Sequence, residues 1–215
     1  MRFSWPERKE KTKVIPPFVM AGFTTSIFFA VIWILAAAID GKWVFGWNAL
    51  SDMGVSMNPA SRVIFNYGCV LTGVFGSVFG YGMAKHERGW LFITGVLTMI
   101  GPLFLMGVGA IPESLETPHI TCASLFGAFA AVAMITSAVG DWTRGMKYYT
   151  LSAVILLIIC GLSQLTGIFG FYEAVCIICI LIWVYIQAHK YYKLIGLIEI
   201  DDPLNKIFDD LNSKG

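Results

Sequence analysis

The chain has 215 residues, of which 57% are hydrophobic and only 13% are charged, whereas a typical soluble domain has roughly 25% charged residues. A chain of this length cannot enclose so much apolar surface in one water-soluble core, so the composition excludes a soluble globular protein and indicates an integral membrane protein. The net charge of +1 gives no reason to expect a nucleic acid partner.

Six apolar runs follow a basic tail formed by residues 1–17. Each run is near the ~20 residues that a membrane-spanning helix needs. The sequence therefore predicts an all-α, polytopic six-transmembrane-helix bundle within residues 18–192, with a further tail over residues 193–215. The expected spans are 18–39, 62–83, 90–110, 119–139, 150–169 and 172–190.

The first run also resembles a secretory signal peptide, because it follows basic residues and ends in Ala36-Ala37-Ala38. A signal core usually has only 7–15 apolar residues, and this run has about 20. We therefore expect an uncleaved first helix.

The distribution of Lys and Arg predicts how the bundle is oriented. With six spans, both tails and the turns at 84–89 and 140–149 lie on one side, and that side holds all Lys and Arg except Lys42 and Arg62. Cytoplasmic loops carry the excess of positive charge in membrane proteins. We expect a multi-pass protein of the cell membrane with both termini in the cytoplasm.

Small residues recur every four positions in two spans. Gly68, Thr72, Gly76 and Gly80 form such a stripe in the second span, and Ala123, Gly127 and Ala131 form one in the fourth. Stripes of this kind let a neighbouring helix approach closely. They are expected to pack helices within the chain, and a homo-oligomer through the same faces stays open.

Two features near the cytoplasmic side are expected to anchor the chain. The last tail places Leu204, Ile207, Phe208 and Leu211 on one face of an amphipathic helix. The tyrosine pairs 148–149 and 191–192, with the lysines next to them, among them Lys190, fit an interfacial aromatic and basic belt.

The outward connections hold the candidate catalytic side chains. Asp52 precedes the second span, Glu113 follows the third, His119 begins the fourth and Glu173 begins the sixth. Short loops on one face of a small bundle are neighbours, so these groups are expected to converge on one outward-facing acidic and histidine pocket. Carboxylates and imidazole can act as general acids and bases.

Asn66 and Gln164 lie about one turn into the second and fifth spans from the same side. Polar side chains within a membrane helix usually face the bundle, because lipid cannot solvate them. We expect both amides to bind a ligand in the pocket. The sequence contains no HExxH motif and no dense ligand cluster, so it assigns neither a metal nor a cofactor.

The five cysteines all lie in apolar runs, and Cys176 and Cys179 share one face of the sixth span. Such a pair can exchange electrons with a quinone, as in enzymes similar to vitamin K epoxide reductase. Those enzymes need a second cysteine pair in a loop, and residues 40–61 contain no cysteine. Buried apolar cysteines are therefore the favoured interpretation.

Three motifs together resemble an uncharacterised family of six-span archaeal and bacterial membrane proteins. The family usually continues the glutamate of the third motif with arginine, and here Ala174 follows. The motifs are Leu50-Ser51-Asp52-Met53-Gly54 with Asn58-Pro59 and Phe65-Asn66-Tyr67-Gly68, then Gly107-Val108-Gly109-Ala110-Ile111-Pro112-Glu113 with His119, then Gly170-Phe171-Tyr172-Glu173.

The resemblance implies a distant relation to Frag-like and DRAM-like proteins and hence an interaction with membrane lipids, with or without lipid modification. Two other functions stay open from the residues. One is a non-catalytic protein that binds or transports a small molecule or cation, or assists assembly. The other is thiol–quinone redox chemistry at Cys176 and Cys179. Whether the protein is an enzyme is left undecided.

Overall fold

The computed structural model describes residues 12–196 and 198–200, and within them six long helices are apolar enough to cross a membrane. This confirms the predicted six-helix bundle. The helices are α1 (Pro17–Asp40), α2 (Pro59–His86), α3 (Trp90–Ala110), α4 (Thr117–Thr143), α5 (Lys147–Ser163) and α6 (Phe169–Ile195). Three short 3-10 helices lie between them: η1 (Ser51–Val55), η2 (Glu113–Leu115) and η3 (Gln164–Thr166).

The ends of the first two helices follow from local sequence. Pro17 and Pro59 each occupy the first turn, where proline loses no helical hydrogen bond. The Asn58 side chain caps α2 by accepting a hydrogen bond from the Ala60 amide at 3.1 Å. Gly41 ends α1 with φ of 69°, a left-handed conformation that glycine adopts without steric cost.

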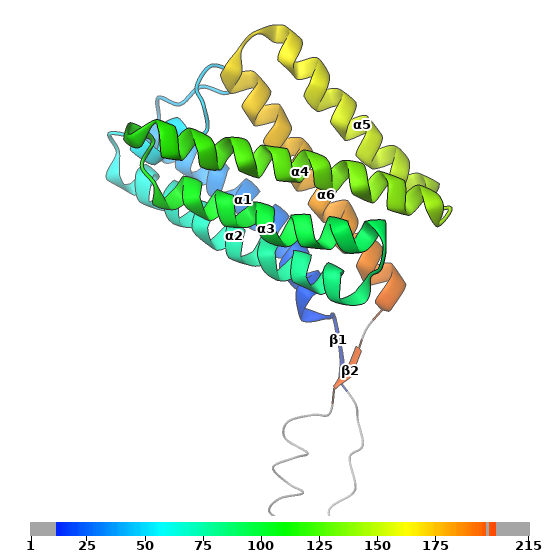
Figure 1. Cartoon of the computed structure of the whole chain (residues 1–215). Coiled ribbons are helices and arrows are strands. Elements are labelled where there is room, and N and C mark those ends of the chain that lie inside the picture. The colour runs from blue at the N-terminus through cyan, green and yellow to red at the C-terminus, as the bar shows by residue number, and fades with distance from the viewer. Residues whose placement is uncertain (1–11, 197, 201–215) are drawn as a thin grey trace, which may run out of the picture.

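The helices pack as a closed ring in chain order. Each helix contacts the next, and α1 also packs against α6, which closes the ring (Figure 1). Two strands, β1 (Thr12–Val14) and β2 (Ile198–Ile200), pair antiparallel just beyond α1 and α6. The start of α1 and the end of α6 therefore lie at the same end of the bundle.

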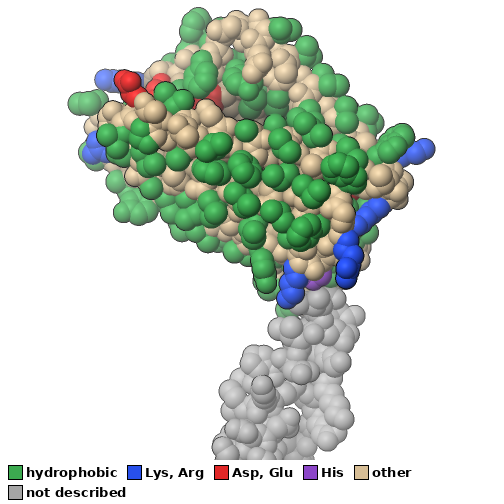
Figure 2. Space-filling model, in the orientation of Figure 1, with side chains coloured by type: hydrophobic (Ala, Val, Ile, Leu, Met, Phe, Trp, Pro, Cys, Tyr) green, Lys and Arg blue, Asp and Glu red, His purple; other side chains and the backbone are tan. Residues whose placement is uncertain are grey.

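Apolar side chains cover the middle of the bundle in the view of Figure 2, and charged side chains gather at its two ends. Most of the Lys and Arg side chains in this view lie toward the end next to the strands, and the visible Asp and Glu side chains lie at the opposite end together with a few Lys and Arg side chains. This distribution matches a protein embedded across a bilayer. We refer to the end next to the strands as the inner end and to the other as the outer end.

Helices α2 and α3 make the closest contact in the bundle. A methyl group added at Gly80 would lie 2.2 Å from the Met99 backbone nitrogen, and one at Gly95 would lie 2.4 Å from the Ala84 nitrogen. Only glycine permits the two backbones to approach this closely. The stripe in α2 therefore packs helices within the chain, and α3 continues through Pro102.

The stripe predicted in the fourth span behaves differently. Gly127 is exposed, and an added methyl group there would meet nothing within 4 Å. Within the described residues Gly127 does not pack against another helix, whereas Ala123 of the same stripe packs against the core. The amphipathic helix expected after residue 203 and most of the basic tail lie outside the described residues.

Gly80→Ala and Gly127→Ala form a matched pair that tests the close contact. We expect Gly80→Ala to destabilise the bundle by about 1–3 kcal/mol, because the methyl group would push α3 away from α2. Gly127→Ala is expected to be neutral or slightly stabilising, since alanine favours a helix. Thermal unfolding in detergent measures both, and equal melting temperatures would contradict the prediction.

Candidate functional site

The Glu173 carboxylate connects the start of α6 to the loop between α1 and α2. Its Oε2 accepts a hydrogen bond from the Leu50 amide at 2.6 Å. The Leu50 side chain is buried, and η1 begins at the next residue. The half-buried carboxylate thus holds the loop against the bundle.

Asp52 turns the same loop back on itself. Its Oδ2 accepts hydrogen bonds from the Ala49 amide at 3.0 Å and from the Asn48 side-chain amide at 3.1 Å. A side chain that reaches back to an amide three residues earlier satisfies a backbone donor in a loop that has no regular hydrogen-bonding pattern. Asp52 therefore shapes the loop, and it also lies close enough to act electrostatically on Glu173.

Glu113 extends the cluster to η2. Its Oε1 accepts a hydrogen bond from the Ser51 hydroxyl at 3.2 Å, which joins η2 to η1. Its Oε2 is buried and has no hydrogen-bond partner. Glu113 also lies close enough to Glu173 to act on it electrostatically, so the outer end brings three carboxylates near one another.

His119 lies in the first turn of α4, and only 4% of its surface is exposed. Its Nδ1 lies 2.8 Å from the Ile111 carbonyl oxygen. A carbonyl can only accept, so Nδ1 carries the proton. Nε2 is buried and has no hydrogen-bond partner, and it is an acceptor when the ring is neutral.

The turn that separates Glu113 from His119 is strained. Glu116 has φ of 27°, the only positive φ of a non-glycine residue within residues 12–196 and 198–200. Such conformations cost energy and persist where the surroundings fix them. We name the side chains of Asp52, Glu113, His119 and Glu173 the outer cluster.

The two predicted amides have different surroundings. The Asn66 side chain donates to the Gly54 carbonyl at 3.1 Å and so fixes the end of η1 on α2. Gln164 is exposed and lies in η3, beyond the end of α5, next to Tyr172. The structure therefore places Asn66 beside the loop that the outer cluster holds, and it gives Gln164 no hydrogen bond to that cluster.

An apolar groove opens between α1 and α6, next to the loop that joins α1 to α2. Its volume is about 510 Å³, within the 300–1,000 Å³ of ordinary ligand sites. Trp33 of α1 stacks on Phe45, and the Trp43 ring meets both edge-on. The other lining residues are Ala30, Ile34, Ala37, Ile178, Leu181 and Ile182.

The loop side of the groove depends on the outer cluster for its position. The Trp43 indole donates to the Ala49 carbonyl at 2.8 Å, and Ala49 is held in turn by Asp52. A second cavity lies at the centre of the bundle, lined in part by Thr72 and Thr98, and it has room for only about 50 Å³. That space suits a few water molecules but no lipid chain.

The structure contains a buried ion pair at the inner end that the sequence does not predict. Lys190 of α6 contacts both carboxylate oxygens of Asp141 in α4, at 2.9 and 3.1 Å, and both side chains are 0% exposed. Lys190 is thus not part of an interfacial belt, and its neighbour Tyr191 is 1% exposed. Lys190 stands at the end of an apolar run, a position that suits an interfacial anchor as well as a buried ion-pair partner. The sequence alone therefore does not distinguish these two roles.

Further polar contacts surround this pair. Glu87 forms an ion pair with Arg144 at 2.6 Å and accepts a hydrogen bond from the Tyr191 hydroxyl at 3.0 Å. The hydrogen bond that Arg144 donates to the Glu87 carboxylate raises the pKa of the Arg144 guanidinium. Gln187 is fully buried, and neither of its amide atoms has a partner.

Metal binding finds no support in this arrangement. In the part of the chain that the structure describes, no group of three or more His, Cys, Asp or Glu side chains is placed to hold a metal ion.

A family model matches residues 24–190, which is most of the chain and nearly the whole bundle. The chain belongs to the family described as "Protein of unknown function (DUF998)". This confirms the expected membership of an uncharacterised family. No curated protein and no solved structure matches the chain.

Replacing Lys190 tests the inner ion pair. Lys190→Met leaves the Asp141 carboxylate buried without a partner, so we expect a loss of about 3–5 kcal/mol of stability. Lys193→Met, at an exposed position of the same helix, is the matched control and should change little. Thermal unfolding in detergent measures both variants.

The double variant Asp141→Leu/Lys190→Met removes both buried charges. It is expected to recover most of the lost stability, because two apolar side chains need no hydrogen bonds. A double variant as unstable as Lys190→Met would contradict the assignment of the loss to an unpaired carboxylate.

Proposed function

We propose that this protein binds a membrane lipid at its outer end. The observation that carries the proposal is the groove between α1 and α6, which lies in membrane-spanning helices and is walled by Trp33, Trp43 and Phe45. A groove open to the bilayer is filled by lipid, and aromatic rings at the membrane interface give a chain a rigid apolar surface. The groove takes the lipid tail.

We propose that the outer cluster, which lies at the same end of the bundle but does not line the groove, binds the polar part of the lipid. Glu113 Oε2 and His119 Nε2 are both acceptors without a partner, so they match a head group that carries N–H or O–H donors. A buried acceptor without a donor costs about 1–3 kcal/mol, which a donating ligand would offset. We propose that an amine or hydroxyl head group binds there.

Binding is favoured over catalysis by what the cluster already does. Glu173, Asp52 and Asn66 all hold the loop between α1 and α2, and Glu113 uses one oxygen for the same purpose. His119 uses one ring nitrogen to bond the Ile111 carbonyl at the end of α3. Side chains engaged in this way position a loop. The proposed relation to Frag-like and DRAM-like proteins supports a lipid ligand, and the proposal makes the protein a lipid-interacting member of its family.

Filling the groove tests the proposal. Ala37→Phe places a ring in the groove, and Ala128→Phe places the same ring on an exposed part of α4 as a matched control. Native mass spectrometry of the purified protein is expected to show bound lipid for the wild type and for Ala128→Phe, and at least tenfold less for Ala37→Phe. Equal lipid retention in the two variants would overturn the assignment of the tail to the groove.

The head-group part has its own readout. Glu113→Gln keeps an acceptor for the Ser51 hydroxyl but removes the charge, and His119→Phe removes the free nitrogen. Both variants are expected to shift the bound lipids away from amine-bearing species while Ala128→Phe does not. An unchanged lipid composition would remove the head-group assignment and leave the groove assignment standing.

We also propose that the inner end faces the cytoplasm, from the excess of Lys and Arg there. Cysteines introduced at Lys42 and Lys147, which are both exposed, report the two sides. A membrane-impermeant maleimide applied to intact cells is expected to label Lys42→Cys and to leave Lys147→Cys unlabelled until the membrane is opened. The reverse pattern would mean the opposite orientation.

A further inference from the structure

The connection between α5 and α6 differs in composition from the other connections at the outer end. The loop between α1 and α2 carries Lys42 and Asp52, and the connection between α3 and α4 carries Glu113 and Glu116. By contrast, residues 148–172, which include the whole α5–α6 connection, contain no Asp, Glu, Lys, Arg or His. Loops in water are usually rich in polar residues, so the composition indicates a different environment here.

The length of α5 sets how far this connection reaches. At the inner end, α4 is followed by the short turn 144–146 and then by α5. The span of α5 together with η3 has 20 residues, or about 30 Å, whereas α4 has 27 residues, or about 40 Å. The hydrocarbon core of a bilayer is about 30 Å thick. The α5–α6 connection therefore lies at the outer boundary of the hydrocarbon, and Figure 1 shows it apart from the outer end of α4.

A stripe of exposed apolar side chains runs along α5 into this connection. Ile158 and Leu162 of α5 and Leu165 of η3 are spaced by four and three residues, which places them on one side of this span. They are 54%, 59% and 82% exposed. The exposed apolar face of a membrane-spanning helix contacts lipid. Here that face continues to the end of the span without a charged residue.

The α1–α2 loop adds to this apolar surface. A methyl group added at Gly170 would lie 2.5 Å from the Asn48 carbonyl oxygen and 2.8 Å from the Trp47 carbonyl oxygen. The loop thus lies directly on the first turn of α6. Trp47 is 74% exposed, and Phe169 is 65% exposed. We name the side chains of Trp47, Leu165 and Phe169 the outer apolar rim.

The connection also pairs two of its own backbone donors. The Gly167 amide donates to the Gln164 carbonyl at 3.1 Å, and the Ile168 amide donates to the Thr166 hydroxyl at 3.3 Å. That hydroxyl donates in turn to the Ser163 carbonyl at 2.8 Å. Backbone groups near lipid need partners within the protein, because lipid tails offer none. The two amides of the turn meet this requirement.

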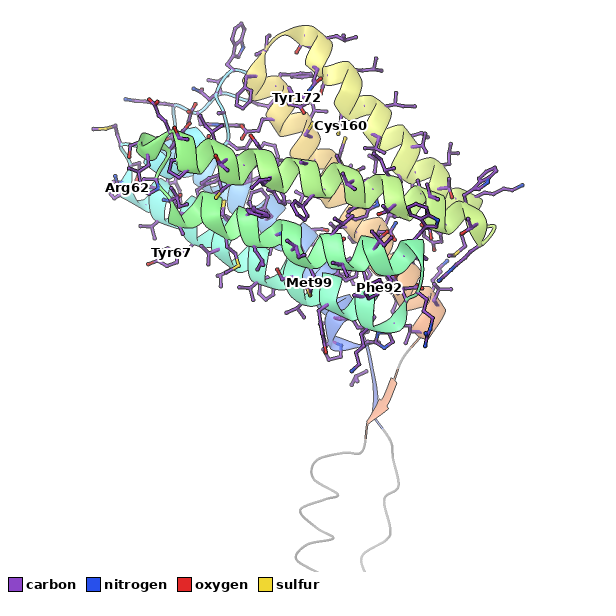
Figure 3. The ribbon with its side chains drawn as sticks, viewed as in Figure 1. Arg62, Tyr67, Phe92, Met99, Cys160 and Tyr172 are labelled. Carbon is purple, nitrogen blue, oxygen red and sulfur yellow. The ribbon has the colours of Figure 1, made fainter. Side chains whose placement is uncertain are left out.

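We propose that the outer apolar rim inserts among the lipids of the adjoining leaflet, at the boundary between acyl chains and head groups. Tryptophan is enriched at this depth, since its ring is apolar and its N–H group is polar. The charged part of the outer end lies elsewhere, because Figure 3 shows Arg62, near the start of α2, well apart from Tyr172 in the first turn of α6. Lipid is favoured over a protein partner because the rim continues the lipid-facing stripe of α5.

The outer end of the bundle thus meets two media. The α3–α4 connection lies in water with its glutamates, whereas the α5–α6 connection and Trp47 lie in lipid. This insertion goes beyond the lipid site proposed above and does not rest on it, because no residue of the rim lines the groove or belongs to the outer cluster. Failure of either proposal leaves the other standing.

Two exposed leucines in 3-10 helices at the outer end, Leu165 in η3 and Leu115 in η2, test the proposal. Leu165→Cys and Leu115→Cys are made in the full-length protein and placed in nanodiscs that hold one chain each, and the wild type gives the background of the native cysteines. A charged maleimide is expected to label Leu165→Cys at least about tenfold more slowly than Leu115→Cys, because a thiol in lipid forms little thiolate, the reactive form. After denaturation the two variants should react equally.

Labelling in cell membranes separates lipid from a protein partner. The same two variants are labelled in membranes from the expressing cells, broken open so that the reagent reaches both faces. Slow labelling of Leu165→Cys in both preparations supports insertion into lipid. Labelling as fast as that of Leu115→Cys in either preparation would overturn the proposal. Fast labelling in both would place the rim in water, and fast labelling in nanodiscs alone would mean that another protein or a second copy of this chain covers it.

Trp47 gives a second readout that needs no new cysteine. Its fluorescence, taken as the difference between the wild type and Trp47→Phe, is expected to be quenched by lipids brominated next to the head group and only weakly by acrylamide in the water. Stronger quenching by acrylamide than by the brominated lipids would overturn insertion of the loop. This readout decides the proposal even where Leu165→Cys fails to fold.

Discussion

The close approach of α2 and α3 is the constraint on which the rest of the bundle depends. In lipid, no hydrophobic effect drives helices together, so backbones must come near enough for dispersion forces and interhelical polar contacts to act. Gly80 and Gly95 permit this because a methyl group at either position would overlap the backbone opposite. Their contact fixes the α2–α3 hairpin, and α1 and α4 then pack against its two sides.

The two ends of the bundle use charge in different ways. At the outer end, carboxylates meet backbone amides and hydroxyl groups, so Glu173 and Glu113 hold η1 and η2 over the helices. At the inner end, Asp141 and Lys190 meet each other with no solvent between them. A buried pair costs desolvation energy, and ionisable residues at membrane depth usually serve a function or fix one arrangement.

The inner pair has a structural consequence for α4 and α6. These two helices have little direct contact, and their polar links are the Asp141–Lys190 pair and the hydrogen bond from the Trp183 indole to the Ser137 hydroxyl at 3.1 Å. Such links specify one relative position of the helices more than they add stability. The outer halves of α4 and α6 lack comparable links, and there the loop and the outer cluster determine the geometry.

The sequence by itself determined the six spans, the polar and charged ends, and the positions of Asp52, Glu113, His119 and Glu173 near one end, because hydropathy and helix length follow directly from composition along the chain. Only the tertiary structure decided which side chains and helix faces contact one another. Helix rotation buries Lys190 against Asp141 and leaves Gly127 exposed, and no pattern within a single span specifies which face meets which neighbour. Gln164 lies beyond the end of α5 because that helix stops at Ser163.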